Sequence, residues 1–135
     1  MSETKDYYRN KVAVVTGGAS GVGLALAETM LGYEARGVIL ADVNDANLAR
    51  ETARLNTAYP GRALGVHCDV TLEAEVQGMI AQAAEFGGGR IDLLFNNAGA
   101  GFAGDHGHAG AEFQLAGGDD GEIAEGQALE HWRAL

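Results

Sequence analysis

A glycine-rich segment between an apolar run and a helix-forming run constrains the fold of this chain more than any other feature. The segment is TGGASGVG, residues 16–23; it directly follows the apolar run 12–15 and directly precedes the run 24–31, which is typical of a helix. Glycines permit a sharp turn and a close approach of the backbone to a ligand. A helix N-terminus offers free N–H groups and a partial positive charge. This order of strand, glycine turn and helix therefore predicts a cradle for phosphate groups.

A second apolar run supports this interpretation. Residues 37–41 are GVILA, and Asp42 follows them, nineteen residues after Gly23. An acidic residue at that distance, at the end of a second strand, is placed to accept hydrogen bonds from the ribose hydroxyls of NAD. The alternative is a simple glycine turn with an aspartate that caps a helix. The strand–turn–helix setting favours the dinucleotide site.

Apolar runs and helix terminators alternate along the chain. They predict strands over 12–16, 37–42, 63–68 and 91–95, and helices over 21–32, 45–58 and 72–86. Pro60-Gly61 and the glycines 87–89 end the second and third helices, and Thr71 is expected to cap the third. The strands are continuously apolar, which is typical of a parallel sheet covered on both faces. We predict an α/β fold, a Rossmann-type doubly wound parallel sheet that is incomplete, with about four strands.

The chain is expected to form one domain with distinct ends. Residues 1–10 are predicted to be a flexible leader, and 11–99 a dinucleotide-binding half-domain. Residues 100–122 are rich in glycine and acidic residues and predict a loop longer than ordinary connections. Residues 123–135 return to a helical pattern.

Three motifs in order carry a resemblance to a known family. The glycine spacing is Thr-Gly-x-x-x-Gly-x-Gly over 16–23, with Leu26 where a third glycine of G-x-G-x-x-G would fall. Cys-Asp-Val-Thr at 68–71 follows the third predicted strand, and Asn-Asn-Ala-Gly at 96–99 follows the fourth. With Asp42 between them, these segments resemble the short-chain dehydrogenase/reductase family over residues 11 to 99.

The glycine loop supplies the first set of expected cofactor contacts. Gly17 is expected to allow the tight turn, Gly21 the approach of the pyrophosphate, and Gly23 close packing of the helix against the strand. Ser20 is expected to donate a hydrogen bond to phosphate, or to cap the helix, and the two roles are compatible. Val22 completes the loop as a further contact.

The resemblance implies the remaining contacts. Asp69 would bond the adenine amino group while Val70 packs on the ring. The alternative for Asp69 is a favourable charge at a helix N-terminus. Asn96, Ala98 and Gly99 would lie beside the cofactor ribose, and Asn96 could equally tie neighbouring strands together.

Charge near Asp42 predicts NAD rather than NADP. A carboxylate accepts bonds from free ribose hydroxyls but repels a 2′-phosphate. Neither Ser20 nor Val43 is basic, and Arg36 lies before the second strand, too early to hold that phosphate.

No catalytic residue is assigned. The resemblance implies an Asn, a Ser and a Tyr-x-x-x-Lys pair after the fourth strand, yet the only lysines are Lys5 and Lys11. Residues 7–11 fit Tyr-x-x-x-Lys as a string, but they precede the glycine loop, so we interpret the match as coincidence.

A metal site is weighed and not assigned. Asp105, His106, His108 and Glu112 have spacings that zinc could use. Only two of them are nitrogen ligands and no cysteine joins them, so a polar loop is the favoured interpretation.

Composition limits partners and location. The net charge of −10 argues against nucleic acid and anionic membranes as partners. Cys68 is the single cysteine, which excludes an internal disulfide and fits a reducing cytoplasm. The polar start of the chain has no secretory pattern, and no apolar run approaches the length of a membrane span.

Three functional hypotheses follow. The first is the N-terminal part of an NAD-dependent oxidoreductase that transfers hydride between an alcohol or ketone and nicotinamide, inactive alone. The second is a non-catalytic dinucleotide-binding module. The third is a truncated fragment whose strand 91–95 leaves an open apolar edge, which predicts homo-oligomers or association through that edge.

Overall fold

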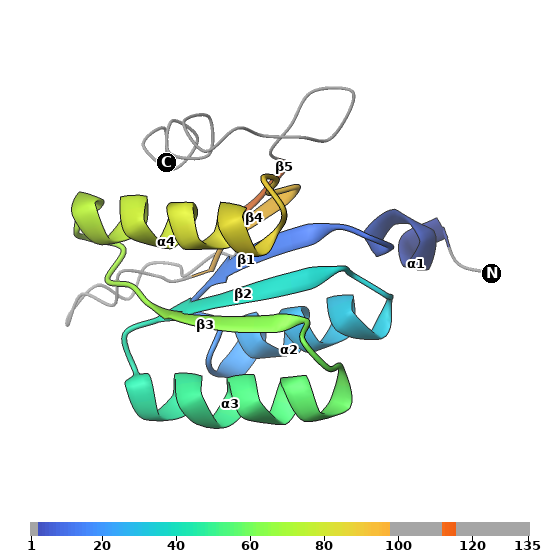
Figure 1. Cartoon of the computed structure of the whole chain (residues 1–135), viewed down its shortest axis with the longest axis horizontal. Coiled ribbons are helices and arrows are strands. Elements are labelled where there is room, and N and C mark those ends of the chain that lie inside the picture. The colour runs from blue at the N-terminus through green and yellow to red at the C-terminus, as the bar shows by residue number, and fades with distance from the viewer. Residues whose placement is uncertain (1–2, 98–111, 116–135) are drawn as a thin grey trace.

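The structure is a twisted sheet with helices on both faces (Figure 1). This computed structural model describes residues 3–97 and 112–115. The strands are β1 Val12–Thr16, β2 Gly37–Asp42, β3 Ala63–His67, β4 Leu93–Asn96 and β5 Glu112–Leu115. The helices are α1 Glu3–Tyr8, α2 Gly21–Gly32, α3 Asp45–Ala58 and α4 Glu73–Phe86. The predicted α/β alternation is confirmed, and β1, α2, β2 and α3 have the predicted bounds.

The sheet has the order β3-β2-β1-β4-β5. The first four of these strands are parallel, and β1 lies at the centre, with Val14 opposite Ile39 on one side and Leu94 on the other. Parallel neighbours joined through helices form the doubly wound arrangement that the sequence predicts.

Strand β5 corrects the expectation of an open edge at β4. It pairs with β4 antiparallel, with Phe95 opposite Phe113, so the sheet has five strands rather than about four. Part of the segment 100–122 is therefore a strand and not a loop. The four residues Glu-Phe-Gln-Leu alternate polar and apolar, a strand signal that the surrounding glycines obscured in the sequence.

Helix α1 corrects the expectation of a flexible leader. Tyr8 stacks near Tyr33, with ring centroids 6.1 Å apart, and the Lys11 Nζ lies 5.6 Å from the centre of the Tyr7 ring. Arg9 forms an ion pair with Glu34, Nη2 to Oε2 3.1 Å. The contacts of Tyr8 with Tyr33 and of Arg9 with Glu34 reach the C-terminal end of α2 and are tertiary, so the polar composition of the segment alone did not reveal the helix.

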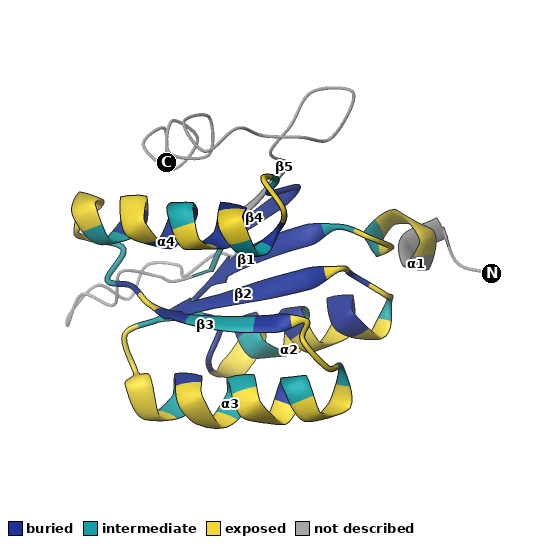
Figure 2. Cartoon of the chain, in the orientation of Figure 1, coloured by how far each residue is buried: buried dark blue, intermediate teal, exposed yellow. Residues whose placement is uncertain are grey.

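Two apolar layers form the core. On β1 and β2, Val14 and Ile39 pack with the buried side of α4, while Val15 and Leu40 pack with α2 and α3. Figure 2 shows β1 and β2 almost wholly buried, β3 partly buried, and the helices buried mainly along the side that faces the sheet. Apolar residues on both strand faces account for the continuous apolar runs.

The helix starts differ from one another. Asn44 caps α3, because its side-chain oxygen accepts a hydrogen bond from the Asn47 N–H at 2.9 Å. The expected cap of α4 by Thr71 is wrong: Leu72 occupies that position, and the Thr71 N–H and hydroxyl both bond Asp69 Oδ1. Asp69 and the N-terminus of α4 compete for hydrogen bonds with the Thr71 side chain, and in this structure Thr71 bonds Asp69.

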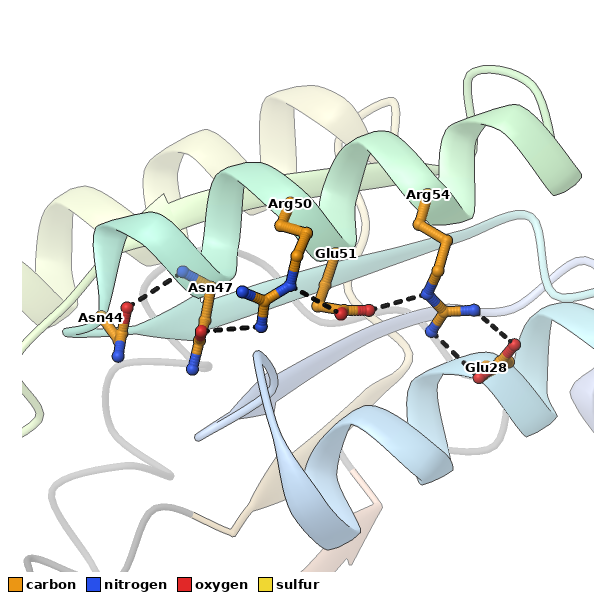
Figure 3. Close-up of polar contacts among 6 residues, drawn as sticks. All are labelled: Glu28, Asn44, Asn47, Arg50, Glu51 and Arg54. Atoms are coloured by element: carbon orange, nitrogen blue, oxygen red, sulfur yellow. Dashed lines mark hydrogen bonds and ion pairs between the residues drawn. The ribbon is translucent and has the colours of Figure 1, made fainter.

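Helices α2 and α3 are tied by a surface network (Figure 3). Arg54 on α3 donates to both carboxylate oxygens of Glu28 on α2, at 2.8 and 3.1 Å, and also to Glu51. The Arg54 and Glu28 side chains are about half exposed, so solvent screening keeps their contribution small. Among the described helices, none is long and apolar enough to cross a membrane.

Candidate functional site

The glycine loop connects β1 to α2 and is held against β2. Gly17 and Gly21 have φ values of 64° and 55°, the left-handed region that glycine adopts without strain. The Gly18 N–H donates to the Ala41 carbonyl at 3.2 Å, and the Ala19 N–H donates to Asp42 Oδ2 at 3.1 Å. The turn is therefore anchored to the carboxyl end of β2.

Two of the glycines face very different surroundings. A Cβ at Gly23 would lie 2.3 Å from the Gly17 carbonyl oxygen and 2.7 Å from Asn97 Nδ2. A Cβ at Gly21 would meet nothing within 4 Å. Gly23 thus permits close packing of α2 on the loop, whereas Gly21 borders open space that a ligand could approach.

Within the described part of the chain, no side chain caps the start of α2. Ser20 occupies the N-cap position with extended backbone, but its side chain makes no capping hydrogen bond. The capping alternative is therefore not used, and the exposed hydroxyl is available to a ligand. Val22 is 64% exposed beside it, and the first turn of α2 holds no acidic residue. The helix dipole and free N–H groups there favour an anion.

Asp42 lies at the end of β2 and faces the loop. Its Oδ2 accepts from the Ala19 N–H and its Oδ1 from the Asn44 N–H, both at 3.1 Å. An ionised carboxylate has about four acceptor positions, so each oxygen retains capacity for a ribose hydroxyl. The two backbone bonds fix the orientation of the carboxylate before any ligand arrives.

The segment that follows β3 lies beside Asp42 at the end of β2. The Cys68 N–H donates to the Asp42 carbonyl at 3.0 Å, and Asp69 and Val70 come next, both half-buried. Hydrogen bonds from Thr71 lower the pKa of Asp69. Cys68 is buried, and burial raises the pKa of its thiol to about 11, so the thiol stays protonated at neutral pH.

The two asparagines after β4 connect to β1 and the loop. The Thr16 hydroxyl donates to Asn96 Oδ1 at 3.1 Å, which favours the strand-tying role for Asn96. Asn97 Nδ2 donates to the Gly17 carbonyl at 3.4 Å. Sequence reasoning did not select Asn97. The register that pairs Thr16 with Asn96 places Asn97, the residue after β4, beside the loop, and that register is a property of the sheet.

Part of the predicted site lies outside the described residues. Ala98 and Gly99 fall there, as do His106 and His108 of the weighed metal site. Within the described part, no three histidine, cysteine, aspartate or glutamate side chains are arranged to hold a metal ion. His67 is half exposed, and its Nδ1 lies 2.7 Å from Asp45 Oδ1.

The structure brings the remaining predicted residues to one edge of the sheet. The carboxyl ends of β1, β2, β3 and β4 carry, in turn, the glycine loop, Asp42, Asp69 and Asn96. Ligands of open α/β sheets bind outside the carboxyl ends of the strands. This edge of the α/β fold combines the N-terminus of α2, of the kind that favours anions, with the Asp42 carboxylate, which can accept hydrogen bonds from hydroxyl groups.

The family is shown by comparison with known proteins. A sequence model described as short chain dehydrogenase matches residues 11–115, so the chain belongs to that family. Momilactone A synthase of Oryza sativa subsp. japonica is 44% identical over 90 residues, which cover 66% of this chain and 31% of that protein. Tropinone reductase-like 2 of Erythroxylum coca is 42% identical over 90 residues, 66% of this chain and 30% of that protein. The chain spans about a third of the length of these relatives.

Solved structures agree on the Rossmann-type fold. A short-chain dehydrogenase/reductase from Burkholderia phymatum in complex with NAD is 41% identical, with a TM-score of 0.63, over 68% of this chain and 32% of that one. A 3-ketoacyl-(acyl-carrier-protein) reductase from Brucella melitensis complexed with NADH is 33% identical, with a TM-score of 0.61, over 68% of this chain and 36% of that one. Both of these similar structures contain a nicotinamide dinucleotide.

Proposed function

We propose that this chain is the cofactor-binding part of an NAD-dependent oxidoreductase. The observation that carries the proposal is Asp42, held by the Ala19 N–H at the edge where the glycine loop and α2 begin. The loop would take the pyrophosphate, Asp42 the adenosine ribose, and Asp69 with Val70 the adenine. Similar proteins in complex with NAD and NADH support the same cofactor class.

Preference for NAD over NADP rests on charge at one end of β2. A 2′-phosphate would lie against the Asp42 carboxylate, and the exposed neighbours Ser20 and Val43 offer no positive charge. Arg36 stands before β2, at the opposite end of the strand from Asp42. Repulsion between the 2′-phosphate and the Asp42 carboxylate would lower the affinity for NADP, so this position favours NAD, whose ribose 2′-hydroxyl is free.

The proposed contribution of this chain is binding and orientation. In a longer protein of this family, the reaction would be hydride transfer between an alcohol or ketone and the nicotinamide. The bound cofactor would supply that chemistry. No Tyr-x-x-x-Lys pair follows the glycine loop in the 135 residues, so we expect no turnover by this chain alone.

Titration calorimetry of the full chain with NADH and NADPH tests the cofactor proposal. We expect NADH to bind more tightly than NADPH. Asp42→Asn should weaken the binding of NADH about ten-fold or more, because a hydrogen bond to a charged group contributes about 1.5–3 kcal/mol. The same variant should reduce the difference in affinity between NADH and NADPH. Glu85→Gln removes a charge from an exposed position on α4 and should change neither affinity. Equal binding of both cofactors by the unaltered protein would contradict the proposal.

A non-catalytic dinucleotide-binding module is the second candidate. It is favoured by the fact that the described site residues all belong to the adenosine and pyrophosphate half of the predicted cofactor contacts. In that case ADP-ribose should bind nearly as well as NADH. A large preference for intact NADH, or dehydrogenase turnover by mass-verified protein, would count against the module.

Location and association remain parts of the proposal. We place the protein in the cytoplasm because its one cysteine is a buried thiol with no role in a disulfide. Self-association through strand edges now has a different basis, because β5 covers β4 and the outer strands of the described sheet are β3 and β5. Sedimentation velocity of the full chain measures this directly.

A further inference from the structure

A polar pocket lies at the opposite end of the sheet from the glycine loop. It is lined by Arg9, Asn10, Glu34, Arg36 and Arg62, and its volume is about 320 Å³. These residues come from the connections that lead into β1, β2 and β3. Parallel strands begin at one common edge, so the three connections meet there, at the end of the sheet that carries α1 in Figure 1.

The lining is positive in a strongly negative chain. Three guanidinium groups face the pocket against the single carboxylate of Glu34, although the whole chain has a net charge of −10. Arg9 is already paired, with Glu34 at 3.1 Å and Asp6 at 3.4 Å. The pocket therefore keeps an excess of positive charge after its internal ion pairing.

The other two arginines have no carboxylate partner among the described residues. Arg62 donates from Nη1 to the Ala35 carbonyl at 3.3 Å, a bond that positions the side chain without neutralising it. The Arg36 side chain makes no hydrogen bond or ion pair within the described part of the chain. All three arginines are exposed, so solvent screens much of their mutual repulsion, and an anion between them would gain charge-assisted hydrogen bonds.

The backbone around these arginines is fixed. The Arg36 N–H donates to the Lys11 carbonyl at 2.9 Å, and the Asn10 N–H donates to the Glu34 carbonyl at 3.0 Å. The guanidinium of Arg36 lies against Gly88, where a Cβ would come within 2.8 Å of Nη2. The arginines therefore extend from connections whose geometry the sheet determines, rather than from a free terminus.

We propose that this pocket binds a phosphate group, as a site separate from the dinucleotide edge. The guanidinium fork matches the oxygens of phosphate, with two parallel N–H···O bonds to each group. Arg36 and Arg62 are the principal ligands, and Arg9 joins them when Glu34 releases it. Free phosphate and a phosphate monoester present the same oxygens, and the pocket opens to solvent, so either can enter.

Residue-resolved NMR titration of the full chain with inorganic phosphate at constant ionic strength tests the proposal. We expect amide shifts at residues 9–11, 34–37 and 62 that saturate with a millimolar dissociation constant. The double variant Arg36→Gln/Arg62→Gln should weaken this binding at least ten-fold. Arg50→Gln removes one positive charge from an exposed position on α3 and should leave it unchanged. Shifts confined to residues 17–23, or unchanged affinity in the double variant, would overturn the proposal.

Glu34→Gln gives a test in the opposite direction. It removes the carboxylate that occupies Arg9, so phosphate binding should tighten several-fold, an effect that a poorly folded variant could not produce. Unchanged or weaker binding contradicts the proposal. A parallel titration with glycerol 3-phosphate distinguishes the sources: equal affinity indicates recognition of the phosphate alone, and tighter binding indicates that the pocket also takes the ester.

Discussion

At the scale of single residues, the same residue type serves different purposes within one short loop. Gly17 and Gly21 supply left-handed backbone, whereas Gly23 supplies only the absence of a side chain. The spacing of the sequence predicted a role for all three glycines. It did not show which of them are needed for a left-handed backbone and which for the lack of a side chain. The structure separates the two, because the Gly17 carbonyl of the same loop and the Asn97 side chain, which follows β4, leave no room for a Cβ at Gly23.

Replacement of Gly23 by alanine tests the close approach. The added Cβ would meet the Gly17 carbonyl, so we expect Gly23→Ala to destabilise the fold by about 1–3 kcal/mol through overpacking and to abolish NADH binding. Urea unfolding and calorimetry measure the two effects.

Gly78→Ala is the matched control for that variant. Gly78 lies within α4, where a Cβ meets nothing within 4 Å. Alanine there should stabilise the protein by about 0.5–1 kcal/mol, because glycine is unfavourable in a helix interior. A Gly23→Ala protein as stable as the unaltered one would show that the loop yields without cost.

His67 predicts a pH dependence of stability. Its hydrogen bond with Asp45, assisted by the charges of Glu75 and Asp69, raises the pKa of His67 above its ordinary value. A raised folded-state pKa stabilises the protein below the unfolded pKa of about 6.5, and the stabilisation is lost as pH rises through the folded pKa. The unaltered protein should therefore exceed His67→Gln in unfolding free energy more at pH 5.5 than at pH 8.5.

NMR titration of the His67 ring provides the direct measurement. Asp45→Asn should return the pKa of His67 toward its ordinary value, since it removes the principal partner. The interpretation fails if the stability difference is equal at both pH values, or if Asp45→Asn leaves the titration of His67 unchanged.

At the scale of elements, buried polar contacts join strands that are far apart in sequence. Asp92 is 3% exposed just before β4, and its Oδ2 accepts from the Val12 N–H at 2.8 Å. Arg90 donates to the same oxygen from Nε at 3.0 Å and Nη2 at 2.8 Å. The contact fixes the start of β4 against the start of β1.

Loss of that carboxylate should be costly. Asp92→Ala leaves the Val12 N–H without its acceptor and Arg90 without its counter-charge, and we expect a loss of about 3 kcal/mol, as for other broken buried pairs. Glu28→Gln, which alters the exposed pair between α2 and α3, should have a far smaller effect. Urea unfolding of both variants measures the loss in unfolding free energy. Similar losses in the two variants would contradict the idea that the buried carboxylate contributes more than the exposed one.

Elements differ in how far their sequence predicts them. The bounds of α2 and α3 could be predicted because glycine, proline and asparagine mark their ends locally. Helix α1 and strand β5 could not, because their partners are distant: Tyr33 stacks on Tyr8, and β4 pairs with β5. Local composition described these segments as polar or glycine-rich, and the tertiary partner decided their structure.

At the scale of the whole molecule, the strand order makes a prediction about local stability. Strand β1 has a hydrogen-bonded neighbour on each side and lies between two apolar layers, whereas β3 is at an edge. Native-state hydrogen exchange should therefore be slowest at the β1 amides Val12–Thr16 and faster in Ala63–His67, because protection follows pairing and burial. Exchange in β3 as slow as in β1 would contradict this order, or would show that a partner covers the β3 edge.

The sequence by itself determined the fold class, the order of the elements from β1 to β4, and several of the residues that gather at the carboxyl edge of the parallel strands. It could do so because strand, turn and helix signals are local, and because parallel strands carry the residues that follow them to one common edge.

Only the tertiary structure decided the pairing of β5 with β4, the contact of Asn97 with the glycine loop, and the gathering of Arg9, Arg36 and Arg62 at the opposite edge. Each of these depends on strand order and register, which bring together residues far apart in sequence. A local pattern of residues does not determine which distant segments become neighbours in the fold.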